Sequence, residues 1–426
     1  MALREHALRR QVVGEMHLRR WPALAAPALV VHMLRLVDEA DRAAEQAALS
    51  GGGAVLAPSD NPRHRQGTIA GLPFVWEAHS EAIGITLFVD LATTGTAVIG
   101  PGGDCPALAL ALAWATDFPG EVLRAARIAV VRDGAERLLP QLELAPDDLV
   151  SCWMGDGTAG WARLWADFRI GPDGFGHMLM EAGTMAPGDL ARLVQRLQEL
   201  GNYRNLALLG LPIAQGAWKE LGRIEQALCA LADEVARPDV TDDQLLDRVS
   251  TLSLDLMAIS AGGAFRMNAT SAYARLAEER LADLDPQPIA GYPSLQDFTQ
   301  RRLLPAVRTC SAHAARTADL SARADRFAAL LRTRIETRIE NQNARLLESM
   351  EQSASLQLRL QQLVEGLSVV ALSYYAIGLL GYVLKAAEAV EPRIEAPLWI
   401  GGAVPVTVLA LWWGLHRMKR RVLGHH

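Results

Sequence analysis

The feature that most constrains the fold is a long stretch near the C-terminus in which a helical pattern runs into an uncharged apolar segment. No proline occurs in residues 306–391. At 100° per residue, one set of apolar side chains in this run falls within about 140° of arc, which predicts a single long helix with one apolar stripe. The stripe consists of Leu320, Phe327, Leu331, Ile335, Ile339, Leu346, Met350, Leu356, Leu360, Leu363 and Leu367.

Two segments near the C-terminus have the length and composition of membrane-spanning helices. Residues 366–384 and 396–415 contain no charged side chain, and about 20 apolar residues are enough to cross the hydrocarbon core of a bilayer. Residues 385–395 form the loop between them. The sequence therefore predicts a two-helix transmembrane hairpin in contact with membrane lipid, followed by a basic tail at 416–426.

The charges that flank these segments predict the orientation of the chain. Four basic residues follow the second segment, whereas the loop carries two basic and three acidic residues. By the positive-inside rule, both termini are cytoplasmic and the loop lies outside. Residues 1–20 lack the apolar core of a secretory signal, so the N-terminal part is expected to stay in the cytoplasm. We predict a multi-pass protein of the plasma membrane.

The chain ahead of the spans is too long for one hydrophobic core. We predict an α+β, mainly α, protein in three parts: an α/β cytoplasmic domain at 1–185, a helical domain at 186–305 and a long stalk helix at 306–365. The stalk and first span together would measure about 118 Å at 1.5 Å per residue. One continuous apolar stripe on such a helix is under-buried in a monomer, which predicts a homo-oligomer joined through a coiled coil of stalks and through the spans.

Hydrophobic patterning predicts the elements of the first domain. Residues 27–49 have the pattern of an amphipathic helix that ends at three glycines. Residues 72–81 and 83–91 have strand character, and the single residue between them indicates either a bulge or a hairpin. Residues 108–115 fit a helix or a buried strand, residues 127–133 a strand, and the turn at 171–174 the tip of a hairpin.

Capping residues and prolines predict the limits of the helices in the second domain. Asp189 is a candidate N-cap for the first helix, and Thr241 with Gln244 has the spacing of a capping box. Pro212, Pro238 and the loop at 285–293 are expected to separate the helices.

Composition and motifs argue against several classes of function. A net charge of -6 gives no basic footprint for nucleic acid. The four cysteines form no Cys-x-x-Cys pair, which argues against a zinc ribbon and a disulfide framework. The glycine clusters lack the lysine of a phosphate-binding loop, and no catalytic triad can be argued from the chain. We predict a protein that is not an enzyme and needs no cofactor.

One candidate metal site remains. Glu77, His79 and Glu81 alternate along a predicted strand, so the three side chains would share one face and could bind a divalent cation. Glu15 and His17 repeat the spacing, and a His/Glu cluster would form if the two segments met. The alternative is that this row is only the solvated face of a strand.

The first span carries a face of small and aromatic residues. Tyr374, Gly378 and Gly381 follow the same helical face, and small residues there permit close helix packing. A pore is the alternative, in which this face would form the wall and an outer ring of carboxylates would concentrate cations. That ring would consist of Glu388, Glu391 and Glu395.

Several stretches resemble a family of uncharacterised bacterial proteins described as predicted membrane-anchored. The residues that carry the resemblance are NYRNLALLGLP at 202–212, DFTQRRLLPAVRTC at 297–310 and the run at 330–382, together with GEMHLRRW at 14–21 and WEAHSE at 76–81. The resemblance implies a bacterial inner-membrane protein with a large cytoplasmic part. It implies no activity.

The order of the predicted parts is also similar to that of CorA-type magnesium transporters. Their Gly-Met-Asn signature is missing, because Gly381, Tyr382 and Val383 stand at the corresponding place. Two functions follow from the sequence. The preferred one is an oligomeric inner-membrane protein used for scaffolding or sensing, and the alternative is a CorA-like divalent-cation transporter or channel.

Overall fold

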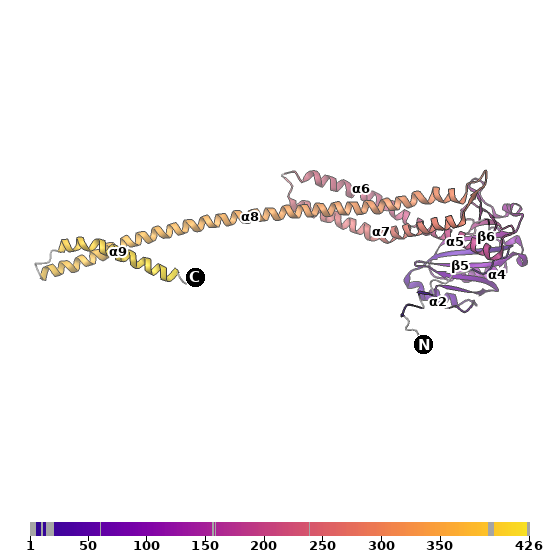
Figure 1. Ribbon diagram of the computed structural model, residues 1–426, viewed down its shortest axis with the longest axis horizontal. Coiled ribbons are helices and arrows are strands. Elements are labelled where there is room, and N and C mark those ends of the chain that lie inside the picture. Colours follow the sequence, from indigo (N-terminus) through magenta and orange to yellow (C-terminus); the bar gives the residue numbers. More distant parts are fainter. Residues whose placement is uncertain are drawn as a thin grey trace. The chain divides into compact units, whose positions relative to one another are not determined.

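The computed structural model describes residues 6–9, 12–13, 21–59, 61–155, 157, 159–237, 239–390 and 396–423. The chain divides into two compact units, residues 1–328 and residues 329–426. The first unit holds a mixed sheet with helices, and the second consists of the remainder of a long helix and a final apolar helix (Figure 1). The α+β class predicted from the sequence is confirmed at this level.

A ten-stranded sheet forms the centre of the first unit within the described residues, in the order β10-β7-β8-β9-β6-β1-β5-β4-β3-β2. All neighbours pair antiparallel except β6 and β9, which are parallel. The strands are β1 (Ala28–Leu36), β2 (Val55–Leu56), β3 (His64–Ile69), β4 (Leu72–Ala78), β5 (Ala82–Asp90), β6 (Glu121–Val131), β7 (Val150–Met154), β8 (Ala162–Ala166), β9 (Gly176–Glu181) and β10 (Gln287–Pro288).

The central strand β1 takes the place of the first half of the helix predicted at 27–49, and the prediction is wrong there. Nearly every side chain of β1 is buried, because β5 and β6 flank it and both faces of the sheet are covered. A strand buried on both faces loses the alternation of polar and apolar residues that would identify it. The second half is helical, as α2 (Arg42–Ser50), and it ends at Gly51 as expected.

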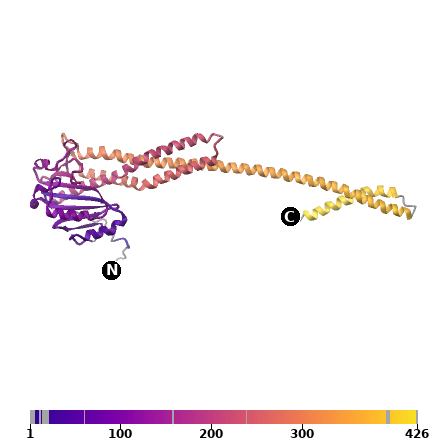
Figure 2. The ribbon, with the colours of Figure 1, turned by 180° about the vertical axis from the view of Figure 1, so that it is seen from behind.

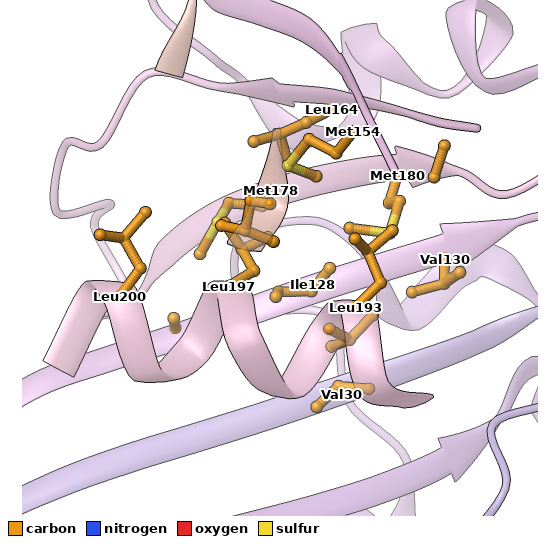
Figure 3. Close-up of a cluster of buried hydrophobic side chains, with 14 of the residues drawn as sticks. Val30, Ile128, Val130, Met154, Leu164, Met178, Met180, Leu193, Leu197 and Leu200 are labelled. Atoms are coloured by element: carbon orange, nitrogen blue, oxygen red, sulfur yellow. The ribbon is translucent and has the colours of Figure 1, made fainter. Parts of the chain in front are cut away.

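The two faces of the sheet carry separate cores. Val30 and Ile128 face helix α5 (Pro187–Leu208), where Leu193 and Leu197 pack on them (Figure 3). Their strand neighbours point the other way, into a second cluster that includes Trp114 of α4. Helix α4 (Pro106–Thr116) settles the ambiguity at 108–115 in favour of a helix. Short helical turns complete this part: η1 (Glu39–Asp41), α3 (Leu91–Thr94), η2 (Thr96–Val98), η3 (Ala135–Arg137), η4 (Leu139–Leu142) and η5 (Pro146–Asp148).

The structure decides the strand alternatives. β4 and β5 pair antiparallel around a turn at 79–81, so the two segments form a hairpin rather than a bulged strand. β8 and β9 also pair antiparallel, which confirms the predicted hairpin around 171–174. The strand predicted at 127–133 lies largely within β6.

Three helices follow strand β9 in the chain. After α5 come α6 (Gly210–Glu234) and α7 (Asp242–Leu284), which pack against each other (Figure 2). The capping box of Thr241 and Gln244 is confirmed at the start of α7. The N-cap prediction for Asp189 is wrong, because Ala186 holds that position and Pro187, whose missing N–H costs nothing there, opens the helix. Pro212 lies in the first turn of α6, and Pro238 lies outside the described residues.

The sequence predicts that the stalk helix begins at residue 306, directly after Pro305. Helix α8 (Leu295–Val390) begins eleven residues earlier. Ser294 accepts a hydrogen bond from the Asp297 amide at 3.1 Å, and Asp297 accepts one from the Ser294 amide at 3.2 Å. Pro305 lies inside the helix, where it removes one backbone hydrogen bond, while Leu303 and Ala306 beside it are buried. This capped start and the buried flanks hold the helix through the proline.

The second unit contains the rest of α8 and helix α9 (Ala396–Leu423). Two helices among the described residues are long and apolar enough to cross a membrane, one within α8 and one at 397–417. Their large apolar side chains are mostly exposed in the single chain.

Candidate functional site

The residues predicted to bind a divalent metal do not share one strand. Glu77 is buried near the end of β4, whereas His79 and Glu81 lie in the turn that follows, because the chain reverses after Ala78. The single-strand prediction is therefore wrong. Glu15 and His17 lie outside the described residues, so the wider His/Glu cluster stays a prediction. Within the described residues no group of three or more His, Cys, Asp and Glu side chains could hold a metal.

Glu81 instead fastens the β4–β5 turn to helix α7. Its two carboxylate oxygens accept hydrogen bonds from Arg266 at 3.0 and 2.6 Å. Burial raises the pKa of Tyr273, and the charge of Glu81 and a hydrogen bond to it raise it further. The Tyr273 ring stacks on Tyr203 of α5 with centroids 6.2 Å apart. Glu81 thus pairs with Arg266 and is linked through Tyr273 to Tyr203 of α5, so these contacts join the β4–β5 turn, α7 and α5.

A buried polar network lies next to this contact, between the sheet and α5. His32 of β1 sits opposite Thr86 of β5, with Nδ1 2.9 Å from the hydroxyl oxygen. Its Nε2 lies 3.1 Å from Oδ1 of Asn202. Because an amide oxygen only accepts, Nε2 carries the proton and Nδ1 accepts from Thr86. Burial, with the charge of Arg124 second, lowers the pKa of His32 to about 3.

Arg124 of β6 joins the same network. Its guanidinium donates to Oδ1 of Asn202 at 3.2 Å and to Oε1 of Gln198. A Cβ at Gly201 would lie 2.6 Å from the guanidinium carbon, so only glycine leaves room for it. Burial, followed by the charge of Arg204, lowers the pKa of Arg124 to about 9. The group remains cationic at neutral pH.

Arg204 of α5 is a second buried guanidinium, and its charge acts on Arg124. Its guanidinium carbon lies 4.5 Å from the ring centroid of Phe168 and 5.2 Å from that of Phe298, and only 9% of the residue is exposed. Such cation–π contacts are worth about 2 kcal/mol when desolvated. Phe168 adopts a φ of 55°, which bulky residues rarely do. In the described part of the chain neither Arg204 nor Arg124 has a carboxylate partner.

This network is suited to holding elements together rather than to proton transfer. An imidazole with a pKa near 3 does not exchange protons at neutral pH, which a general acid or base must do. The network connects β1, β5 and β6 to α5 through Asn202. Gln198 adds an amide nitrogen that has no hydrogen-bond partner among the described residues.

Sequence patterning missed the network because its members are far apart in the chain. His32 and Asn202 are separated by 170 positions. The signal that could have indicated it is the stretch Asn202-Tyr203-Arg204, which opens one of the motifs that resemble the bacterial family. Each of these three side chains makes a contact described above.

The structure distinguishes the residues of the first apolar segment that were candidates for helix packing or a pore wall by whether they contact α9. A Cβ at Gly381 would lie 3.5 Å from Cδ1 of Ile400, so this glycine faces α9. Tyr374 is exposed, and a Cβ at Gly378 would meet no atom within 4 Å. Glu388 lies in the last turns of α8, whereas Glu391 and Glu395 lie outside the described residues. Among Tyr374, Gly378 and Gly381, which the structure describes, only Gly381 lies at a helix contact.

Comparison with models of protein families finds a match over nearly the whole chain. The model of a family described as "Protein of unknown function (DUF3422)" matches residues 4–422. No curated protein and no solved structure matches the chain.

Proposed function

The chain belongs to the DUF3422 family of proteins of unknown function, and we propose that it is a homo-oligomeric, membrane-anchored protein that scaffolds or senses and has no enzymatic activity. The body at 1–328 would lie in the cytoplasm of a bacterial cell. The apolar segments at 366–384 and 396–415 would form its transmembrane hairpin, with both chain ends inside.

The observation that carries the proposal is the bare apolar stripe of α8 beyond residue 339. Leu346, Leu360 and Leu367 are 62%, 61% and 72% exposed in the single chain. Monomeric soluble proteins rarely expose contiguous apolar surface of this kind. Beyond residue 366 lipid can cover it, and before that point a protein partner must.

A second copy is the partner that fits the stalk best. A stripe that runs along one side of a helix matches the same stripe on another copy, as in coiled coils. The residues on the opposite side include Glu351 and Gln362, which can stay hydrated there. The same packing would continue through the small-residue face at Gly378, where a Cβ would meet no atom of the single chain.

A pair of cysteine variants tests this arrangement. Leu360 lies on the stripe, and Gln362 lies 200° away at 100° per residue. In a Cys229→Ser background, Leu360→Cys should crosslink to a dimer with a short bis-maleimide in detergent, whereas Gln362→Cys should remain monomeric. Monomeric product from both variants would contradict the oligomer, and equal dimer from both would contradict a stripe-to-stripe interface.

The CorA-like alternative requires a different measurement. Proteoliposomes that contain the full chain should take up magnesium no faster than empty vesicles if the protein is a scaffold. Uptake that Tyr374→Ala or Gly381→Leu changes would support the channel and remove the scaffold as the principal function.

A further inference from the structure

The helical part of the first unit contains a buried histidine whose ring nitrogens make no hydrogen bond to any described residue. His313 of α8 is 2% exposed, and both ring nitrogens have no hydrogen-bond partner among the described residues. Leaving a buried polar group in this state destabilises the folded chain. The ring lines a cavity of about 300 Å³ between α7 and α8. An unpartnered buried imidazole beside a cavity is a position where a water or an ion can bind.

Two sulfur side chains lie beside this imidazole. Cys310 precedes His313 by three residues, so both project from the same face of α8. Met267 of α7 lines the cavity with His313 and also packs in one buried cluster with Cys310. All three side chains are at least nine-tenths buried.

The pairing of α7 with α8 places Met267 between the other two. A Cβ at Gly263 would lie 3.6 Å from Cε1 of His313, one turn before Met267. About one turn after it, Thr270 lies with Cys310 against the same glycine, Gly210. A thiol, an imidazole and a thioether therefore converge in the interface of the two helices.

The chemistry of this set points to a soft monovalent metal. Thiolate and thioether sulfur are the protein ligands that select Cu(I), and imidazole also suits copper. One thiolate and one Cu(I) ion sum to zero charge, whereas a divalent ion would leave a buried positive charge at a large cost in free energy. We propose that Cys310, His313 and Met267 bind one Cu(I) ion, which replaces the thiol proton of Cys310 as that proton leaves to solvent.

The cavity also provides a route for the ion. Ser260, Ala264 and Asn268 line it and are exposed, so it reaches the surface of the first unit. This site is separate from the Glu/His residues considered above for a divalent cation. It does not depend on the proposed scaffold or on the membrane spans.

Copper binding by the full chain in detergent tests the site. Under anaerobic, reducing conditions, the protein should remove one equivalent of Cu(I) per chain from a chromogenic Cu(I) chelator. Cys310→Ala and His313→Ala should each weaken binding by at least about 100-fold, since even residues that only support a metal ligand cost 10- to 100-fold. The matched control Cys229→Ala, which removes an exposed cysteine, should bind as the wild type does.

X-ray absorption gives a second readout, which does not require the alanine variants to fold. The extended fine structure above the copper edge should show two sulfur neighbours and one nitrogen neighbour in the wild type, and Met267→Leu, which conserves volume, should lose one sulfur. Less than one equivalent bound by the wild type, undiminished binding in the Cys310→Ala/His313→Ala double variant, or an unchanged spectrum in Met267→Leu would overturn the proposal.

Discussion

At the scale of single residues, one side-chain oxygen joins a helix to a sheet. Oδ1 of Asn202 accepts from His32 and from Arg124, which come from two different strands. Gly84 and Gly201 leave the space that these partners occupy, since a Cβ at either position would lie within 3.3 Å of the His32 or Arg124 side chain. A helix-to-sheet contact built on polar groups fixes one docking position, because any slippage would leave buried donors unsatisfied.

Removing that oxygen should be costly. Asn202→Ala leaves the imidazole N–H and part of the guanidinium of Arg124 without their acceptor, and we expect a loss of about 3 kcal/mol in the free energy of unfolding. Asn205→Ala is the control, because its amide only donates to Gly201 O in its own helix, and it should cost less than about 1 kcal/mol. Urea denaturation in detergent measures both. Equal losses would show that the network contributes no stability of its own.

The neutral state of His32 predicts a pH dependence. Its pKa is about 3 in the folded chain and near 6.5 in the unfolded chain. As the pH falls below about 6.5, the unfolded chain takes up a proton that the folded chain refuses until about pH 3. Stability is therefore lost across this window, by up to about 1.4 kcal/mol per pH unit.

His32→Gln isolates this contribution from that of the other titrating groups. The difference in unfolding free energy between the wild type and the variant, measured from pH 7 to pH 4.5, should shrink or reverse in favour of the variant as the pH falls. Curves that stay parallel over this range would show that His32 is not held neutral.

At the scale of elements, local signals were predictable from the sequence and long-range ones were not. The capping box at Thr241 needs only four consecutive residues, and the structure confirms it. β1 could not be distinguished from a helix, because burial of both its faces depends on helices α4 and α5, which come later in the chain. The spacing of Cys310 and His313 is visible in the sequence, but Met267 joins them only through the pairing of α7 with α8.

The packing of α5 on the sheet makes alanine unfavourable at Gly201, although alanine is the better helix former. Alanine normally stabilises a helix interior by about 1 kcal/mol relative to glycine, and Gly216→Ala on α6, where a Cβ would meet nothing within 4 Å, should show that gain. Gly201→Ala should instead cost about 1–3 kcal/mol, because Arg124 is held in place by Gln198 and Asn202. Thermal denaturation of the two variants compares them. A gain in both would mean that the guanidinium moves aside freely.

At the scale of the whole molecule, the C-terminal third was the most predictable part. Its periodicity and its uncharged segments are properties of consecutive residues, and the two candidate spans lie within α8 and α9. The candidate site in the first unit could not be predicted, since its residues are brought together by the order of the strands. The predicted domain limits at 185 and 305 stay predictions.

Deletion of residues 366–426 tests the anchor. The shortened chain loses both uncharged segments, so we expect it in the soluble fraction after a high-salt and carbonate wash, while the full chain stays with the membranes. A reporter joined after residue 423 of the full chain should remain in the cytoplasm. Membrane retention of the shortened chain, or a reporter exposed to the periplasm, would contradict the two-span topology.

Helix α8 is continuous from Leu295 to Val390, so a residue added to it or deleted from it rotates all later positions about the helix axis. Each inserted residue turns all later positions by about 100° about the axis, so one or two extra residues would aim the two halves of the stripe in different directions. Seven residues come to about 700°, only some 20° short of two full turns. Stalks of other lengths can therefore keep a single apolar side when they grow or shrink by about seven or about eleven residues, since both come within about 20° of whole turns.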